Sequence, residues 1–340
     1  MKAAIFHSPH DLRIEEEEMP AIGDYEVLIK VKACGICGSD LHLYKFNWCP
    51  ESVLRQTVSG KKIPGHESSG EIVTVGSQVQ GFAVGDRACG VGFGAMAEYV
   101  PVFVIPDMTL IKLPDVLSYE EGATLEPLAD GLHIANLGHP VEGENAMIFG
   151  VGAIGLGVIQ CLGALGVRLK NIIAVDVSDK RLDLAKQFGA SVCINARKED
   201  PLKKALEICG PAPLLYPPGM AAPPAVEIVY DCVGASKDRT GPPVIQQALD
   251  IVKEGGRIVC FGTFQSAVTV DFGPLIWKHP TIVGVLGFTP EEMAQALELM
   301  LTGKVKRKPV ISHEFPLDQA KKAFETQLKA SDSVKVLIKP

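Results

Sequence analysis

The chain has 340 residues, of which 47% are hydrophobic and 21% charged, as expected for a globular protein long enough for two domains. Its 33 Lys and Arg against 40 Asp and Glu give a formal net charge of −7 without a basic run, which argues against a nucleic-acid or anionic-membrane partner. No apolar stretch approaches the roughly 20 residues that span a bilayer, so we also expect no membrane insertion.

The N-terminal segment predicts no export signal. It opens Met1-Lys-Ala-Ala-Ile-Phe-His7 and turns acidic at residues 15–18, without the architecture of a signal peptide. The nine cysteines are an odd number, and in a chain that is not exported they are better interpreted as thiols or metal ligands than as a disulfide framework. We therefore expect a cytoplasmic protein.

The first 130 or so residues predict a β-rich, barrel-like domain. Short alternating runs occur at Glu26–Lys32, Gly70–Val75 and Glu98–Val104, and they end at turn residues such as Gly76-Ser77 and Gly85-Asp86.

From Ala146 onward the pattern changes to apolar strands that alternate with helical runs, which indicates βαβ units on a parallel sheet. The expected strands are Ala146–Phe149, Asn171–Val175, Ile228–Asp231, Gly256–Phe261 and Thr281–Phe288. A helix near Pro290–Leu301 and a short strand at Ser333–Ile338 follow. We expect an α/β protein in which residues 138–288 form a doubly wound parallel-sheet domain, inserted into a β-rich domain of residues 1–137 and 289–340.

One segment, Gly210–Pro224, fits neither pattern. Its many prolines cannot be accommodated in a helix, so it is interpreted as a surface loop or a polyproline-II excursion. Loop insertions of this kind are tolerated between two elements.

A dinucleotide site is predicted where the first parallel strand ends. The turn Gly150-Val151-Gly152-Ala153-Ile154-Gly155 follows this strand and opens a helix to about Leu165. Its glycines permit a tight turn, a close approach to a pyrophosphate and close packing of the helix on the strand. The first helical N–H groups then face the phosphates.

The next strand ends at Asp176, where a carboxylate can accept hydrogen bonds from the adenosine ribose. The same carboxylate would repel the additional phosphate of NADP, so the pattern favours NAD. Lys180 and Arg181 leave NADP open, because either could pair with a 2′-phosphate. They could equally cover the adenine or lie in solvent.

Candidate metal ligands are concentrated in the β-rich domain. The segment Cys34–His42 contains the thiol of Cys37, and Gly65-His66-Glu67 and Leu125-Glu126-Pro127 follow it. One Cys, one His and one carboxylate suit a catalytic zinc whose fourth position stays open, and a thiolate selects zinc over magnesium or calcium.

Each of these motifs alone has another interpretation. Cys34 and Cys37 form one pair of cysteines, but the second pair that a structural zinc site needs is missing. The Gly-His-Glu sequence can be an ordinary turn. Glu126 can cap a helix or form an ion pair near the start of that helix. Their coincidence with a dinucleotide site in one chain favours a catalytic zinc.

Together these motifs resemble the zinc-dependent medium-chain alcohol dehydrogenases, in particular the sorbitol (polyol) and threonine dehydrogenase branches. The resemblance covers essentially the whole chain. It rests on Gly35–His42, Gly65–Gly70, Val84–Arg87, Glu126–Leu128, the Gly150–Gly155 turn, Asp231–Gly234 and Gly255–Arg257.

The resemblance implies a GroES-like catalytic domain, a Rossmann NAD-binding domain and a role for each site residue. Cys37 and His66 would bind zinc, Glu126 would be a direct or water-mediated third ligand, and Glu67 would be an exchanging ligand or its neighbour. Ser39 would receive the substrate proton and pass it through the cofactor ribose to His42. The cofactor would contact the residues Gly150, Gly152, Ala153, Ile154, Gly155, Asp176, Arg181, Val233 and Leu286.

The chain departs from this family at two places. Asp86–Gly90 runs almost directly into Gly94–Tyr99, and only Cys89 remains of a four-cysteine lobe, so we expect one catalytic zinc and no structural zinc. Gly287-Phe288-Thr289 stands where sorbitol dehydrogenases have an Arg-Tyr pair, which argues against sorbitol itself. Three aromatic residues could either line a substrate pocket or pack in the core, namely Tyr44, Phe46 and Trp48.

Two other functions remain as alternatives. A zinc-free quinone or enoyl reductase of the same superfamily would lack the Cys, His and Glu ligands that this chain has. A non-catalytic NAD-binding protein would not need Ser39 and His42 beside intact metal ligands. By resemblance we expect a homodimer or homotetramer acting on an alcohol, polyol or ketone, with the strand Thr281–Phe288 as a candidate edge for pairing.

Overall fold

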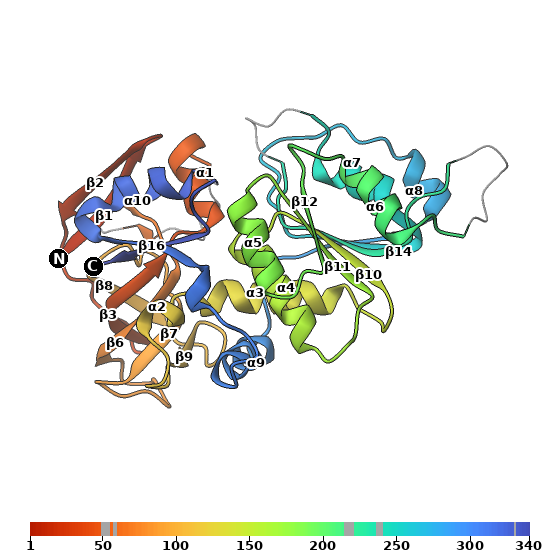
Figure 1. Ribbon diagram of the computed structural model, residues 1–340. Helices are drawn as coiled ribbons and strands as arrows, with labels where there is room; N and C mark the ends of the chain where they lie inside the picture. Colours follow the sequence, from red (N-terminus) through yellow and green to blue (C-terminus); the bar gives the residue numbers. More distant parts are fainter. Residues whose placement is uncertain (49–54, 57–59, 214–220, 236–240, 330) are drawn as a thin grey trace. The chain divides into compact units, whose positions relative to one another are not determined.

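A computed structural model describes residues 1–48, 55–56, 60–213, 221–235, 241–329 and 331–340. The chain divides into two compact units (Figure 1). Residues 1–129 and 288–340 form the β-rich unit, which contains both termini, and residues 130–287 form the parallel-sheet unit.

The largest sheet of the β-rich unit has seven strands in the order β16-β17-β3-β6-β7-β9, with β8 paired to β3. Its central strand β3 alternates Val and Ile with other residues, so that one face packs in the core. The strands are β3 (Glu26–Gly35), β6 (Glu67–Val75), β7 (Arg87–Val91), β8 (Tyr99–Phe103), β9 (Leu110–Lys112), β16 (Ile311–Pro316) and β17 (Lys335–Lys339). The C-terminal β17 therefore lies directly beside β3, which is far from it in sequence.

A second sheet and several short helices complete this unit. The sheet has the order β2-β1-β5-β4, with β1 (Lys2–Ser8), β2 (Asp11–Glu16), β4 (Arg55–Gln56) and β5 (Lys62–Ile63). The helices are α1 (Gly38–Phe46), α2 (Tyr119–Gly122), α9 (Pro290–Leu301) and α10 (Ala320–Gln327), with the 3-10 turns η2 (Lys308–Val310) and η3 (Leu317–Gln319). Local signals start α9, where the N-cap Thr289 and Glu292 form a capping box and Pro290 is the first helical residue.

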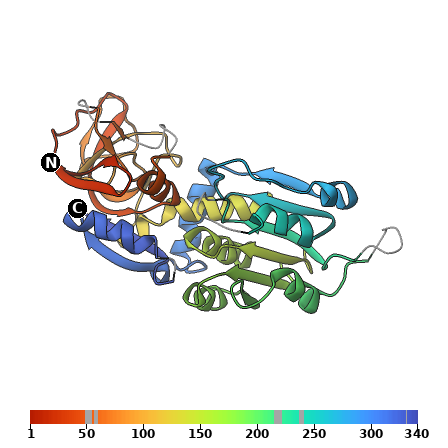
Figure 2. The same ribbon diagram turned by 90° about the horizontal axis from the view of Figure 1, so that it is seen from above.

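The parallel-sheet unit contains six strands, all parallel, in the order β12-β11-β10-β13-β14-β15 (Figure 2). This is the order of a doubly wound dinucleotide-binding fold. The strands are β10 (Asn145–Phe149), β11 (Asn171–Asp176), β12 (Val192–Asn195), β13 (Val226–Asp231), β14 (Val252–Cys260) and β15 (Thr281–Gly284). The predicted fold class, a β-rich domain with a doubly wound parallel sheet, is confirmed.

Helices cover both faces of this sheet. On one face, alternate strand residues such as Met147 and Phe149 share a core cluster with α6 (Pro201–Cys209), α7 (Val244–Ile251) and α8 (Gly273–Lys278). The helices α4 (Ala153–Ala164) and α5 (Asp179–Gln187) contact the strands but add nothing to this cluster, and they cover the other face.

The helix α3 (Leu125–Leu137) belongs to both units. The boundary expected before Gly138 lies at its C-terminal end, whereas the units separate within it, after Ala129. Its later turns pack in the parallel-sheet unit, where the Ala135 carbonyl accepts a hydrogen bond of 3.2 Å from the Tyr230 hydroxyl. Its first turn, which carries Glu126, stays with the β-rich unit.

The strand expected over Thr281–Phe288 is too long. β15 ends at Gly284, and Gly287 has a φ of +70°, which a strand does not contain. Residues 285–288 therefore leave the sheet and lead to the cap of α9.

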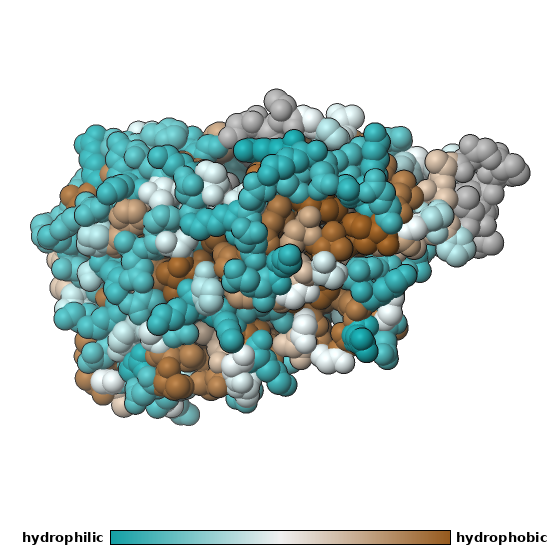
Figure 3. Space-filling view, in the orientation of Figure 1, coloured by the Kyte–Doolittle hydropathy of each residue, from teal (hydrophilic) through white to brown (hydrophobic). Residues whose placement is uncertain are grey.

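Two further observations concern the surface. No helix among the described residues is long and apolar enough to cross a membrane. Figure 3 shows mostly hydrophilic side chains over one face, interrupted by hydrophobic patches.

The proline-rich segment is described only at its ends, because residues 214–220 lie outside the described residues. These two ends pair with each other, and the Ala212 N–H donates a hydrogen bond of 2.8 Å to the Pro223 carbonyl.

Candidate active site

Three side chains of the ligand type converge in the β-rich unit. The Cys37 sulfur, a His66 nitrogen and a Glu67 carboxylate oxygen all lie within 4.8 Å of one another. Cys37 is the N-cap of α1, and His66 and Glu67 stand at the start of β6. A thiol, an imidazole and a carboxylate at this spacing are the donors of a catalytic zinc site, so these residues fit the metal that the sequence predicts.

The glycine before His66 is required by its surroundings. Gly65 has a φ of +91°, and a Cβ there would lie 2.7 Å from the Met96 Cγ and 2.8 Å from the Cys34 sulfur. Any other residue would strain the backbone and displace the turn that presents His66. The buried Cys34 thus packs behind this turn.

Asp40 connects the two segments that carry the candidate ligands. Its side chain is buried, and it accepts a hydrogen bond of 2.9 Å from the Cys37 N–H and another of 2.9 Å from the Gly65 N–H. One carboxylate therefore holds both segments in register. Sequence analysis assigned Asp40 no role, although its position three residues after the helix N-cap is a known capping signal.

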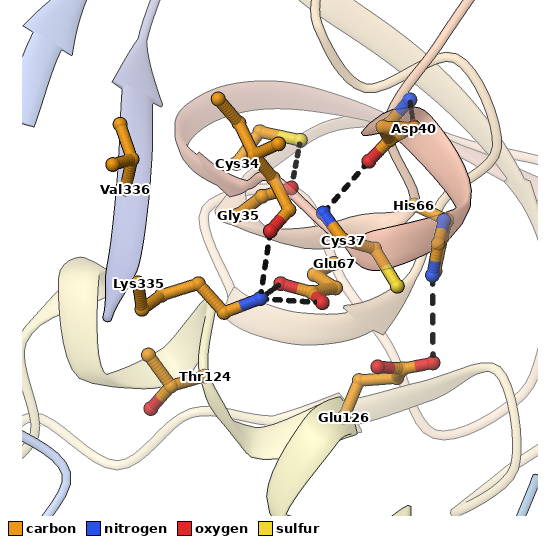
Figure 4. A network of polar contacts seen from close by, with 12 residues as sticks. Cys34, Gly35, Cys37, Asp40, His66, Glu67, Thr124, Glu126, Lys335 and Val336 are labelled. Carbon is orange, nitrogen blue, oxygen red and sulfur yellow. Dashed lines mark hydrogen bonds and ion pairs between the residues drawn. The ribbon is translucent and has the colours of Figure 1, made fainter. Parts of the chain in front are cut away.

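Glu126 approaches the same place from the first turn of α3. Its Oε1 lies 3.8 Å from the Nε2 of His66 (Figure 4). The hydroxyl of Ser69 in β6 donates to the Tyr119 carbonyl at 2.5 Å, which ties β6 to the short helix before α3. The carboxylates of Glu67 and Glu126, expected as alternative ligands, thus both lie close to His66.

Lys335 was not found by sequence analysis. Its Nζ lies 2.6 Å and 2.5 Å from the two carboxylate oxygens of Glu67 and donates to the Ile36 carbonyl at 3.0 Å (Figure 4). In sequence, 268 residues separate Lys335 from Glu67. The only local signal was a lysine at the start of a short C-terminal strand whose central residues are apolar.

The electrostatics of the metal-free site favour proton uptake. Burial, reinforced by Glu67, raises the pKa of the Cys37 thiol well above its ordinary value. Burial alone would lower the pKa of His66, but the neighbouring carboxylates, first Glu126, outweigh it and raise that pKa. A metal ion held by these two side chains would have to displace both protons, so its affinity for them would increase with pH.

The proposed proton acceptors lie on α1. Ser39 and His42 are three residues apart and therefore lie on the same side of the helix. Within the described part of the chain, the buried Ser39 Oγ has no hydrogen-bond partner. The His42 ring packs edge-on against Trp48, with 5.8 Å between the ring centroids.

Of the three aromatic residues after Cys37, Tyr44 packs in the core. It is fully buried, and its ring centroid lies 5.1 Å from that of Phe324. Phe46 and Trp48 are partly exposed.

In the parallel-sheet unit, the glycine-rich turn lies between β10 and α4. A Cβ on Gly155 would lie 2.0 Å from the Gly150 carbonyl oxygen, so the helix can start this close to the strand only with glycine. Gly152 is the N-cap of α4 and offers no side-chain cap, which leaves the N–H groups at Ala153 and Ile154 available to an anion.

Asp176 ends β11 beside this turn. Its Oδ2 accepts from the Val151 N–H at 2.9 Å, and its Oδ1 accepts from the N–H groups of Val177 and Ser178 at 2.7 and 2.9 Å. Arg181 Nη1 lies 3.9 Å from Oδ2. The predicted ribose acceptor and the predicted cationic residue therefore form one cluster.

The other two predicted cofactor residues lie at different places. Val233 packs against the glycine-rich turn. It lies so close that a Cβ on Gly150 would be 2.4 Å from the Val233 Cγ2. Leu286 follows β15 and is 94% exposed.

Comparisons with known proteins agree with both units. Residues 23–115 match the family described as alcohol dehydrogenase GroES-like domain, and residues 153–302 match the family described as zinc-binding dehydrogenase. The chain is 30% identical over 372 residues to (R,R)-butanediol dehydrogenase of Bacillus subtilis, covering 100% of both chains. It is 30% identical over 356 residues to L-idonate 5-dehydrogenase of Vitis vinifera, covering 96% of this chain and 91% of that one. The crystal structure of 2R,3R-butanediol dehydrogenase from Bacillus subtilis superposes with a TM-score of 0.80 at 29% identity, covering 100% of this chain and 99% of that one.

We expect Asp40→Asn to weaken zinc binding by roughly 10- to 100-fold. An amide offers one acceptor in place of two, so the N–H of Cys37 or of Gly65 loses its buried partner and the ligands lose their register. Competition between the metal-free protein and a chromophoric chelator measures this. Asp86→Asn, which weakens an exposed turn in the same unit, should leave the affinity unchanged; equal affinities of both variants would contradict the role of Asp40.

We expect Gly155→Ala to weaken NAD binding at least about tenfold, because α4 must move away from the turn. The matched control is Gly163→Ala in the same helix, where a Cβ meets no atom within 4 Å. That change should leave binding intact and stabilise the helix by about 0.5–1 kcal/mol. Calorimetric titration with NAD and thermal unfolding measure the two effects.

Proposed function

Since this chain belongs to the zinc-dependent medium-chain alcohol dehydrogenase family, we propose that it transfers a hydride between a secondary alcohol or polyol and NAD, with the corresponding ketone as the other partner. The observation that carries this proposal is the convergence of Cys37, His66 and two carboxylates within one unit. The idonate and butanediol dehydrogenases among its relatives are named for secondary alcohols, which supports this substrate class.

Cys37 and His66 would hold the zinc together with a carboxylate from Glu67 or Glu126. When bound, zinc lowers the pKa of a substrate hydroxyl so that its proton can leave near neutral pH. Ser39 would accept this proton, and its Oγ is suited to the task because it has no hydrogen-bond partner among the described residues. His42, on the same side of α1, would take the proton on toward water, and a bound cofactor would supply the ribose hydroxyls between the two side chains.

A bound NAD would supply the hydride acceptor for this reaction. The parallel-sheet unit would bind the pyrophosphate at the N-terminus of α4 and the adenosine ribose at Asp176. Arg181 already has Asp176 as a partner at 3.9 Å, which supports NAD over NADP. Val233 and Leu286 would contribute further contacts to the cofactor.

The test is a metal analysis joined to an activity scan. We expect about one zinc per chain, with no second structural zinc, and formation of NADH rather than NADPH from secondary alcohols and polyols. Cys37→Ser should lose both the zinc and the activity, whereas Cys193→Ser, a thiol in the other unit, should retain both. Absence of zinc from the wild type, or activity untouched by Cys37→Ser, would return the zinc-free reductase or the non-catalytic NAD-binding protein as the better function.

We also propose a homo-oligomer that pairs through β15. This strand ends the parallel sheet, and apolar side chains are exposed on and near it, with Ile276 71%, Trp277 52% and Ile282 39% exposed. An uncovered apolar edge of this kind is a liability in a monomer. Light scattering should give a dimer or tetramer for the wild type and a smaller species for Ile276→Asp/Ile282→Lys; a wild-type monomer would refute the interface.

A further inference from the structure

We propose that Lys278 is a proton-sensitive clamp: as a neutral amine it fastens α8 to the end of α7, and on protonation it loosens this contact. The inference concerns the parallel-sheet unit and depends neither on the metal site nor on the proposed reaction. It assigns a role to a buried ionisable side chain that the dinucleotide site does not use.

The helix α8 depends on its neighbours for its position. It has only six residues, Gly273–Lys278, and a helix this short is not stable on its own. Leu275 packs at the edge of the core cluster of the parallel sheet, and Lys278, three residues later, lies on the same side of the helix. The outer side carries Ile276 and Trp277 of the proposed pairing surface, which are 71% and 52% exposed. Lys278 is therefore the second inward anchor of this helix.

The side chain of Lys278 reaches the C-terminal end of α7. Lys278 is buried, and its Nζ donates to the Leu249 carbonyl at 2.7 Å and to the Asp250 carbonyl at 2.6 Å. Both carbonyls belong to the last turn of α7, where helix carbonyls have no partner within the helix. One amine therefore satisfies two of these groups and joins the two helices.

This contact matches a neutral amine better than an ammonium. An amine has two N–H donors, and the two carbonyls accept both, whereas an ammonium has three donors. Among the described residues Lys278 has no carboxylate as an ion-pair partner, and the Asp250 Oδ1 accepts instead from the Gln246 Nε2 at 2.9 Å. Protonation thus adds a buried charge and a third N–H for which the described residues offer no acceptor, and both are unfavourable.

The other charged groups on the elements around α8 have partners of their own. These groups are Lys253 with Glu227, Glu254 with His279 and Arg257 with Glu144 on β14, and Asp271, which accepts from the Gly273 N–H just before α8. The Cys260 thiol of β14 stays protonated, because burial raises its pKa to about 12, and β15 has no titratable residue. Asp250 is therefore the charge that acts on Lys278.

These surroundings move the titration of Lys278 toward neutral pH. Burial lowers the pKa of Lys278 from 10.5 to about 8, and Asp250 offsets only part of this effect. The unfolded chain keeps the ordinary pKa of lysine, so between the two values it binds a proton that the folded chain does not. The contribution of Lys278 to stability therefore rises with pH through this interval and is lowest below it. Acidification thus loosens the helix that carries the proposed pairing surface.

The test compares the urea unfolding of the wild type, Lys278→Met and Lys278→Arg from about pH 7 to about pH 9.5. Relative to either variant, the unfolding equilibrium constant of the wild type should fall roughly 20-fold over this range, because methionine does not titrate and arginine stays charged. A lysine that only caps α7 as a cation would keep its charge, and these ratios would stay constant. Lys186→Met is the matched control, because this lysine also lies in the last turn of a helix, α5, but is exposed, so its profile should run parallel to that of the wild type.

Hydrogen exchange then locates the effect in α8. The His279 N–H donates to the Leu275 carbonyl at 3.0 Å and reports whether this helix is closed. After correction for the intrinsic rate, its protection should increase about tenfold from about pH 7 to about pH 9 in the wild type and stay constant in Lys278→Arg. Parallel unfolding profiles of the wild type and Lys278→Arg, or protection of α8 that does not change with pH, would overturn the proposal. If neither variant folds, the exchange of the wild type decides, with the amides of α5 as the internal reference.

Discussion

The β-rich unit buries several acidic side chains close to one another, and its structure depends on providing each of them with a compensating partner. Asp40, Glu67 and Glu126 are buried close to the Cys37 thiol, where unpaired charges are very unfavourable. Their compensation comes from Lys335, from backbone N–H groups and, when bound, from the metal. Because Lys335 belongs to the last strand, the site is complete only when the C-terminal segment has returned to β3.

Carboxylates that accept from backbone N–H groups recur at the key turns of both units. Asp40 holds the segments of Cys37 and Gly65, Asp176 holds the turn at Val151, and Asp231 Oδ1 accepts from the N–H groups of Val233 and Gly234 at 2.9 Å each. Charge-assisted hydrogen bonds of this kind are short and strong. They make irregular backbone rigid where a ligand must be positioned.

Features that depend on neighbouring residues could be predicted from the sequence. The strand, glycine-rich turn, helix and terminal Asp176 follow one another along the chain, and each requires a residue type set by local geometry. The helix predicted near Pro290–Leu301 is present as α9, and its cap and its proline are local signals. The side chains of Cys37, His66 and Glu67, singled out as candidate donors because a metal restricts donor chemistry to few residue types, do lie together.

The sequence by itself thus determined the order of elements, the two kinds of sheet and the candidate donors. Only the tertiary structure decided that Lys335 lies on Glu67, that Asp40 binds the turn before His66, that Tyr44 packs in the core, and that β15 ends at Gly284. These contacts join segments far apart in the chain or depend on backbone that leaves a sheet. The local sequence pattern does not say which distant strands will be neighbours. Strands pair through backbone hydrogen bonds, which nearly every residue type can make.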